Sequence, residues 1–322
     1  MNWIKRIIKV GEKIKRVIKS RPTAGDIASS LWNNCPACSK LTLKEEIKKN
    51  YFICECGYHF DAPPEEHFTK LFDGDYEIID VPSYIDPDPL RFVYDGIKYI
   101  DKIKNYRKKS GLKTSLHAAY GKIDSISAVV VASDFKFGGG AWNPQTSEYF
   151  LESCQKAIDK KVDLFLTIFQ TGGVAVTTGV NGLTSCMLKS TIGLSEVKKN
   201  NIVTIAIASS KTTGGPYASA FFNHHICGVE SSISTDILFA GKRVSANAGT
   251  TELPPDFGTS SGVYKSGLVD FVLNNRHEIK NTVTVLTRIL KKKNLETTIN
   301  TSEETSAEQS SKQILPTTSK AI

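Results

Sequence analysis

The sequence lacks the long apolar runs of a membrane protein. No uninterrupted apolar stretch in its 322 residues reaches the roughly 18 residues that a membrane-spanning helix needs. Charged residues interrupt its first apolar residues, so we do not expect a secretory signal. Its content of hydrophobic residues, 40%, and of charged residues, 23%, is that of a globular protein. We therefore expect a reducing, intracellular location, where clustered cysteines bind metal more often than they form disulfides.

The sequence also lacks the familiar catalytic motifs. Its one G-x-S-x-G match, GTSSG at residues 258–262, follows LPPDF and not an apolar strand, and the sequence contains no Walker A and no H-E-x-x-H motif. This argues against nucleophile-elbow hydrolases, P-loop NTPases and zincin metalloproteases. We interpret His224 and His225 as a packed or surface pair. Cys154, Cys186 and Cys227 lie in apolar surroundings, which favours core packing over a nucleophilic role. The remaining possibility is chemistry carried out mostly by backbone amides.

Positive charge is concentrated near the start of the chain. The formal net charge is +8, and residues 1–22 hold eight basic side chains against one acidic one, which gives +7. Apolar residues in this arm recur near a helical period. One interpretation is an amphipathic basic helix that contacts anionic lipid, nucleic acid or an acidic partner. The other is a solvated arm without a specific partner.

Composition divides the chain into five segments. A basic arm is predicted over residues 1–29, a zinc ribbon over 30–60 and a polar connector over 61–110. The main domain is predicted over 111–292. Residues 293–322 are rich in Thr, Ser and Glu with few large apolar side chains. Such a tail cannot bury enough surface to offset chain entropy, so we predict that it is disordered.

In the main domain, short apolar runs rich in β-branched residues alternate with glycine turns. AVVVASDFKF leads into GGG, VDLFLTIFQ into TGG, and NIVTIAIASS into KTTGG. Stretches typical of amphipathic helices, such as SEYFLESCQKAIDKK, lie between several of them. Buried strands that alternate with helices indicate an α/β layer architecture. The glycines fall where strands end, which is where such folds bind ligands.

The predicted ribbon contains four cysteines with nearly the spacing of a zinc site. Cys35 and Cys38 form a C-x2-C knuckle, but Cys54 and Cys56 are one residue too close for a second one. A C-x-C pair in an extended chain fits the knuckle turn poorly, whereas Cys56-x2-His59 restores the two-residue spacing. Three alternatives follow: the set Cys35, Cys38, Cys54 and Cys56; the set Cys35, Cys38, Cys56 and His59; or a degenerate site without metal. A closed four-ligand zinc site would be structural.

Two glycine loops follow successive predicted strands. In FQTGGVAVTTG, residues 169–179, a strand is expected to end at Phe169 and a helix to begin soon after Gly173. Adjacent glycines allow a sharp turn and let a ligand approach the backbone, because no Cβ stands in the way. Their amides can stabilise a carbonyl oxygen that becomes an oxyanion or enolate. SKTTGGPYAS, residues 210–219, repeats the design.

These motifs occur in an order that resembles a known family. The cysteine ribbon, SGLKTSLHAAYGKIDSISAVVVASDFKFGGG, the TGG loop, KTTGGPYASAFF and FAGKRV…LPPDFG…GLVDFVL resemble the β subunit of bacterial and plastid-type acetyl-CoA carboxylase carboxyltransferases. The resemblance covers about residues 30–292. It implies an α/β fold of the ClpP/crotonase type, with repeated ββα units preceded by a zinc ribbon.

The resemblance also implies a reaction and its partners. The β subunit would share its active site with an α subunit, in an α2β2 complex. It would transfer a carboxyl group from carboxybiotin to acetyl-CoA, giving malonyl-CoA, the first committed step of fatty acid synthesis. A biotin carboxyl carrier protein would hold the biotin, and a separate biotin carboxylase would use ATP. The complex would be cytoplasmic, or located in the stroma of a plastid.

Residue by residue, the resemblance assigns roles to the two glycine loops. Gly172 and Gly173 match the amides that hold the enolate oxygen. The second loop matches residues that shape the acyl-CoA pocket, namely Thr212, Thr213, Gly214 and Gly215. No side-chain base is implied, because the base in this family is thought to be biotin itself once it has released carbon dioxide.

The chain departs from the family pattern in its first loop, where the family reads S-G-G-A-R-M-Q-E-G. Ala175 stands in place of the arginine and Thr178 in place of the acid. After FGGG the chain reads AWN instead of S-M-G, and Tyr149 replaces a lysine. Two other functions therefore stay open. One is a catalytically impaired scaffold that holds the α subunit, and the other is a zinc-ribbon protein that binds nucleic acid through its basic arm.

Overall fold

A computed structural model describes residues 31–81, 84–179, 181–232, 235–241, 245 and 253–291. The basic arm predicted at residues 1–29 and the tail predicted at residues 293–322 lie outside this part of the chain. Contacts within the chain divide it into two units, Met1–Phe60 and Asp61–Ile322. The division falls at the carboxyl end of the predicted ribbon.

The described part of the first unit is a small hairpin followed by a helix. β1 (Trp32–Asn34) and β2 (Leu41–Leu43) pair antiparallel, and α3 (Lys44–Lys49) follows directly. Its buried apolar side chains include Ile47, Tyr51 and Ile53. A unit of this size buries little apolar surface, so we expect a bound metal to supply much of its stability.

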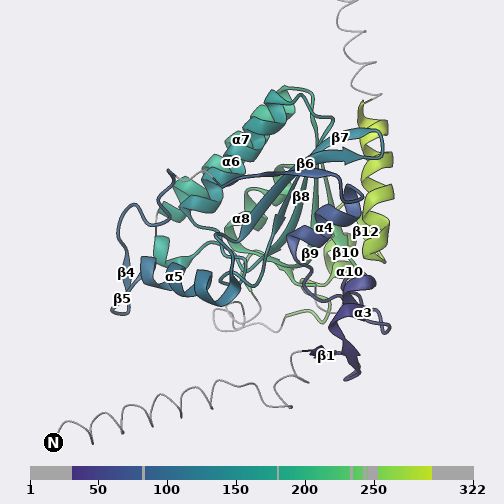
Figure 1. Cartoon of the computed structure of the whole chain (residues 1–322), viewed down its shortest axis with the longest axis horizontal. Coiled ribbons are helices and arrows are strands. Elements are labelled where there is room, and N and C mark those ends of the chain that lie inside the picture. The colour runs from purple at the N-terminus through teal and green to yellow at the C-terminus, as the bar shows by residue number, and fades with distance from the viewer. Residues whose placement is uncertain are drawn as a thin grey trace, which may run out of the picture. The chain divides into compact units, whose positions relative to one another are not determined.

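The second unit is built around an eight-stranded sheet (Figure 1). Five neighbouring strands are parallel, and two edge-side strands are antiparallel to their neighbours. In spatial order they are β12 (Phe271–Leu273), β10 (Ile226–Glu230), β9 (Val203–Thr213), β8 (Leu164–Thr171), β7 (Ile126–Ser133), then β6 (Leu116–Ile123) and β3 (Tyr76–Ile79), with β11 (Ile237–Leu238) paired to β9. The antiparallel β6–β7 pair, followed by a helix and more parallel strands, confirms the predicted α/β fold.

Helices cover both faces of this sheet (Figure 1). On one face lie α6 (Pro144–Asp159) and α7 (Lys189–Lys199), and on the other lie α4 (Pro64–Leu71) and a helix over residues 279–291. β8 is buried along its whole length because alternate side chains enter two different apolar cores. Phe165 belongs to the core beneath α6, whereas Leu166 belongs to the core beneath α4.

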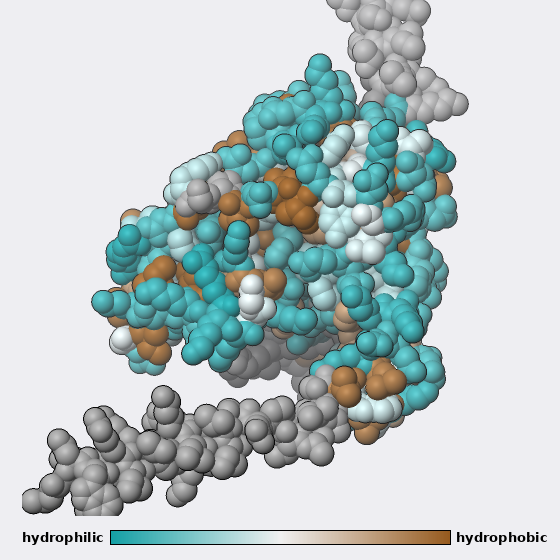
Figure 2. All heavy atoms as spheres, viewed as in Figure 1, coloured by the Kyte–Doolittle hydropathy of each residue, from teal (hydrophilic) through white to brown (hydrophobic). Residues whose placement is uncertain are grey.

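Residues 61–110 are not the simple connector that their polar composition predicts. They contribute α4 and the strand β3, which pairs with β6 in the main sheet. They also form the hairpin of β4 (Val93–Tyr94) and β5 (Ile97–Lys98) and the basic helix α5 (Tyr99–Ser110). Around this hairpin, apolar side chains lie exposed among hydrophilic ones (Figure 2). Neither here nor elsewhere among the described residues is a helix long and apolar enough to cross a bilayer.

A buried ion pair closes the α4 side of the sheet, and its loss is expected to be costly. Arg276 Nη2 lies 2.8 Å from Glu230 Oε2, and neither side chain has exposed surface. Arg276→Met should lower the free energy of unfolding by about 3–5 kcal/mol, because Glu230 loses its positive partner away from water. Urea unfolding measures this change. A loss below about 1 kcal/mol would match an exposed pair instead and contradict the burial described here.

Candidate functional site

The first glycine loop begins where β8 ends. The strand runs to Thr171, two residues further than the sequence predicts, and Gly172 and Gly173 follow it. Gly173 has a φ of +114°, a conformation that residues with a Cβ rarely adopt. A single 3-10 turn, Val176–Thr178, comes next, and a π-helical segment over Gly182–Leu188 leads into α7. The helix expected soon after Gly173 therefore starts later and less regularly.

The two glycine loops lie against each other. After β9, Gly214 and Gly215 open the short helix α8 (Gly214–Ala218). A Cβ on Gly214 would lie 3.0 Å from the Cα of Gly173, which is tighter than ordinary contacts. Glycine at both positions therefore lets the two backbones meet. The structure thus brings together the two loops that the sequence places after successive strands.

The amide of Gly172 does not face a ligand as the sequence predicts. Its N–H donates to the carbonyl oxygen of Gly139 at 2.9 Å, which ties the loop to the FGGG turn. The Gly173 N–H donates to Thr171 Oγ1 at 3.1 Å. A hydroxyl acceptor on a side chain can rotate away, whereas a carbonyl fixed in a turn cannot. Of the two predicted donors, Gly173 is therefore the one whose acceptor can rotate away.

The amide of Val174 is a further donor that sequence reasoning missed. Trp142 N–H donates to Gly173 O at 2.9 Å, and Ala175 N–H donates to Trp142 O at 2.8 Å. In this parallel bridge the intervening Val174 directs its own N–H away from Trp142. No acceptor for it is found in the part of the chain that the structure describes. Its nitrogen lies beside the second glycine loop, 3.8 Å from where a Cβ on Gly214 would stand.

The threonines of the second loop are paired in the sheet and do not line the open pocket that the resemblance implied. Thr212 and Thr213 pair with β11 and are buried. Thr212 Oγ1 donates to the carbonyl oxygen of Phe169 at 3.4 Å, and Gly214 N–H donates to the carbonyl oxygen of Phe239 at 2.9 Å. These residues thus shape the second loop from within. Gly215 is closely packed as well, because a Cβ there would lie 2.6 Å from Val174 Cγ2 and 3.2 Å from Met187.

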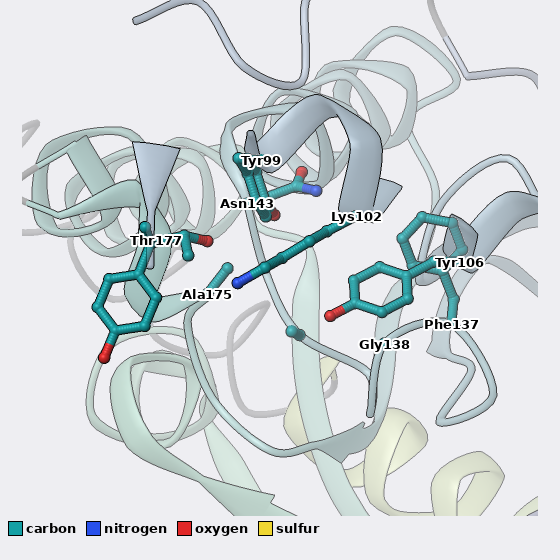
Figure 3. Close-up of a pocket in the computed structure, with 10 residues that line it drawn as sticks. Tyr99, Lys102, Tyr106, Phe137, Gly138, Asn143, Ala175 and Thr177 are labelled. Carbon is teal, nitrogen blue, oxygen red and sulfur yellow. The ribbon is translucent and has the colours of Figure 1, made fainter. Parts of the chain in front are cut away.

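A cavity of about 330 Å³ adjoins the first glycine loop (Figure 3). Ala175 and Thr177 of that loop form one wall, and Phe137, Gly138, Ala141 and Asn143 of the neighbouring turn form a second. The hairpin β4–β5 and helix α5 complete it with Tyr94, Tyr99, Lys102 and Tyr106. The wall and the loop are connected, because Gly139, next to Gly138, accepts the Gly172 N–H.

The local sequence explains why Asn143 holds its position in the cavity wall. Asn143 Oδ1 accepts the Thr146 N–H at 3.0 Å, and Thr146 Oγ1 accepts the Asn143 N–H at 2.6 Å. This is a capping box, and Pro144 occupies the first helical position, where a missing N–H costs nothing. The start of α6 is therefore fixed, and with it one side of the cavity.

Lys102 extends from α5 across the cavity toward the loop that carries Ala175 (Figure 3). Its ammonium lies 5.2 Å from the centre of the Tyr94 ring, a cation–π distance. Among the described residues no carboxylate forms an ion pair with it, whereas Lys104 pairs with Asp101 at 3.3 Å. An unpaired ammonium between aromatic rings can bind a phosphate or carboxylate group.

The helical spacing of three residues in α5 could have predicted this cavity wall, although the composition of the segment does not. Tyr99, Lys102 and Tyr106 stand at positions i, i+3 and i+7, which share one face of a helix. The Lys-rich stretch KIKNYRKKSG looks like a solvated connector when it is judged by its charge. Its helical period identifies a face with two aromatic rings and one cation.

The four thiols of the predicted ribbon converge. Cys35 Sγ lies 3.6 Å from Cys56 Sγ, Cys38 Sγ lies 3.8 Å from Cys54 Sγ, and all four lie within 4.8 Å of one another. Zinc with bonds of about 2.3 Å needs tetrahedral sulfurs about 3.8 Å apart, so the cluster fits zinc closely. Burial raises the pKa of Cys35, but backbone N–H groups of Cys38 and Ala37 outweigh it and lower the pKa to about 7. This favours the thiolate, the form that binds metal.

A turn explains how the short C-x-C spacing serves this cluster. Gly57 N–H donates to Cys54 O at 2.9 Å, and Gly57 has a φ of +84°. Because the chain is not extended here, Cys54 and Cys56 both reach the other thiols. His59 is buried in a bridge with Ile53 and is not part of the cluster. The geometry therefore favours the four-cysteine set over the set that contains His59.

Comparisons with known proteins identify the family. Residues 96–321 match a family model described as a carboxyl transferase domain. The chain is 34% identical over 312 residues to the acetyl-coenzyme A carboxylase carboxyl transferase subunit beta of Pelagibacter ubique (strain HTCC1062), covering 96% of this chain and 97% of that protein. It is 30% identical over 295 residues to the protein of the same name from Rhizobium meliloti (strain 1021), covering 91% and 93%.

Solved structures share the fold at low sequence identity. A Pseudomonas malonate decarboxylase hetero-dimer aligns with a TM-score of 0.55 at 16% identity, over 75% of this chain and 90% of that one. A transcarboxylase 12S structure aligns with a TM-score of 0.56 at 16% identity, over 77% and 43%. These likenesses support the fold alone. From the family model and the relatives at 30% identity or more, the chain belongs to the carboxyl transferase family, among proteins named acetyl-coenzyme A carboxylase carboxyl transferase subunit beta.

Proposed function

We propose that the chain is the β subunit of an acetyl-CoA carboxylase carboxyltransferase, which moves a carboxyl group from carboxybiotin to acetyl-CoA to give malonyl-CoA. The supporting observation is the meeting of two glycine loops at the carboxyl ends of β8 and β9, in a chain of this family. The reaction breaks the N–C bond of carboxybiotin and a C–H bond of the acetyl methyl group. It forms a C–C bond and an N–H bond, since the methyl proton passes to the biotin nitrogen. In between, the thioester oxygen carries negative charge.

Backbone amides of the first loop are the proposed donors to that oxygen. The Gly173 N–H becomes available when the Thr171 hydroxyl rotates, and the Val174 N–H already lacks an acceptor among the described residues. Fixed donors in a site shielded from water stabilise developing charge more strongly than water does. Gly172, bonded to Gly139, holds the loop in place. The second loop, Thr212 to Gly215, shapes the opposite wall.

The cavity beside the first loop is proposed to take the nucleotide end of acetyl-CoA. Tyr94 and Tyr106, which are not buried, offer rings on which adenine can stack, and Lys102 offers a cation to a phosphate. Ala175 brings no charge to the position where related loops carry arginine. The ammonium of Lys102, which reaches toward this position from α5, would supply that charge from a different element.

Lys102→Gln is expected to raise the KM for acetyl-CoA roughly tenfold or more with little change in kcat, because one hydrogen bond to a charged group is lost in substrate and transition state alike. Steady-state kinetics of the assembled enzyme measure this split. Lys104→Gln is the matched control, since Lys104 is exposed and paired with Asp101. Acetyl-pantetheine, which has no nucleotide, should show no change. An equal rise in KM for both substrates would contradict the assignment.

The ribbon and the partners complete the proposal. The four cysteines would hold one zinc ion in a closed, structural site, with no open position for chemistry. An α subunit would complete the active site in an α2β2 complex, and a biotin carboxyl carrier protein, charged by a separate biotin carboxylase, would deliver carboxybiotin. None of the seven cysteines is in a disulfide, which fits a reducing compartment such as the cytoplasm.

Reconstitution tests this function. The chain is co-expressed with the α subunit from its own genome, and the purified complex is mixed with carboxylated carrier protein and acetyl-CoA. Malonyl-CoA, detected by mass spectrometry, should form only when all components are present. A stable α–β complex that makes no product would instead favour the non-catalytic scaffold.

A further inference from the structure

A layer of buried polar side chains lies at the strand ends that carry the glycine loops, on the α4 side of the sheet. Its members, His67, Gln170, Ser209, Glu230 and Arg276, have no exposed surface. Arg276 Nη2 lies 3.2 Å from Ser209 Oγ and 2.8 Å from Glu230 Oε2, so one guanidinium links the ends of β9 and β10. Buried polar networks are costly unless well satisfied, so one at this place indicates a role beyond filling space.

Gln170 connects this layer to both turns of the proposed site. Its backbone carbonyl lies against the FGGG turn, since a Cβ on Gly140 would be 2.0 Å from the oxygen. Its side-chain Nε2 donates to the carbonyl oxygen of Ala62 at 2.8 Å, in the segment before α4, and lies 3.5 Å from His67 Nε2. Residues 171–173 follow it directly. A shift of Gln170 would therefore move the first glycine loop and the FGGG turn together.

His67 is suited to receive this amide because it is uncharged. Burial lowers the pKa of His67 to about 3, and the nearby positive charge of Arg276 lowers it as well. A neutral imidazole has one ring nitrogen without hydrogen, which can accept from an amide. The contact with Gln170 is therefore expected to persist at every pH at which an enzyme of this kind works.

We propose that Gln170 is a positioning residue for carboxyl transfer. Its buried amide fixes the loop that carries Gly173 and Val174, and it acts through that loop without touching substrate. The inference rests on the proposed function, because this loop is the proposed oxyanion site. Misplacement of reacting groups by about 1 Å can cost roughly 100-fold in turnover, whereas a contact that is merely structural costs stability alone.

Gln170→Leu tests the proposal, because leucine keeps most of the side-chain volume and removes the amide. The matched control is Thr167→Val on the same strand, which removes a buried hydrogen bond from Thr167 Oγ1 to His224 Nε2 at 3.0 Å, away from the loop. A third variant, Gln170→Leu with His67→Leu, removes both side chains of the 3.5 Å contact and should recover part of the lost Tm, while the Ala62 carbonyl still lacks its donor. Each variant is compared for Tm, for kcat and KM in the reconstituted enzyme, and for amide hydrogen exchange in residues 169–179.

We expect Gln170→Leu to lower kcat roughly 10- to 100-fold at unchanged KM and to speed exchange in residues 169–179. Thr167→Val should lower Tm comparably but keep kcat within about twofold, and the double variant should regain Tm without regaining kcat. A kcat that recovers together with Tm, or that falls equally in Thr167→Val, would overturn the inference. If the unchanged enzyme makes no malonyl-CoA, the proposed function fails; unaltered exchange in Gln170→Leu would separately overturn the positioning role.

Discussion

Replacing Gly173 by alanine is expected to lower carboxyl transfer by roughly 100-fold or more, the cost of losing an oxyanion donor. The φ of +114° is one that alanine rarely adopts, so the peptide would turn and its N–H would no longer point at the thioester oxygen. The new methyl group would not clash with the protein. Its nearest neighbours would be Thr213 O at 3.5 Å and Gly214 Cα at 3.6 Å, which are ordinary van der Waals distances. The loss should therefore appear in kcat far more than in folding.

Gly267→Ala is the matched control for this substitution. Gly267 also has a positive φ, +73°, and a Cβ there would meet nothing within 4 Å. The control therefore carries backbone strain without altering the proposed site, and it should lower Tm while leaving turnover within about twofold. If the two variants lose turnover equally, the effect at Gly173 is due to backbone strain alone. If Gly173→Ala keeps its turnover, the loop is only a turn and does not bind the oxyanion.

Replacing any one true ligand of the ribbon is expected to abolish its zinc binding. The two ligand sets that the sequence allows differ in one residue each, because Cys54 belongs to one set and His59 to the other. With four converging thiols, Cys54→Ser should reduce zinc from about one ion per chain to nearly none and unfold the ribbon, since structural zinc supplies roughly 10–16 kcal/mol at neutral pH. His59→Gln should keep its zinc.

Zinc per chain, measured by atomic absorption after exhaustive dialysis, separates these outcomes. Loss of zinc in His59→Gln with retention in Cys54→Ser would establish the alternative set. Absence of zinc from the unaltered, folded protein would exclude both sets and leave a degenerate site. Chelation offers a second readout, because a structural site that loses its metal should expose residues 31–60 to proteolysis.

The predictable parts of this protein are those in which short patterns act locally. Mostly apolar runs that lead into glycine pairs became β8 and β9, because strands buried on both faces carry mainly apolar side chains instead of a polar alternation. The four cysteines were identified by their spacing. The objection to Cys54-x-Cys56 assumed an extended chain, and the turn at Gly57 removes it.

The parts that could not be predicted depend on contacts between distant segments. The acceptor of the Gly172 N–H is Gly139, 33 positions earlier in the chain, and no local pattern indicates that pairing. The cavity is likewise built from a connector, a turn and a loop that meet only in the fold. The role proposed for Gln170 likewise depends on the carbonyl of Ala62, 108 positions earlier in the chain, which accepts from its amide.

Two departures from the family pattern have structural explanations. Trp142 is fully buried, with its ring stacked at 6.2 Å on Phe169 at the end of β8. Tyr149, in place of a lysine, donates from its hydroxyl to Ile79 O and accepts the Ala118 N–H at 3.0 Å. It thereby joins α6 to β3 and β6. These residues pack the fold around the loops.

Isotope-edited infrared spectroscopy tests the central claim most directly. Acetyl-CoA labelled with ¹³C at the thioester carbonyl is bound to the α–β complex, and its C=O stretching band is isolated by difference from unlabelled substrate. If loop amides polarise this oxygen, the band should move to lower wavenumber on binding and return toward the free value in Gly173→Ala. A bound thioester whose band coincides with that of free acetyl-CoA would contradict the account.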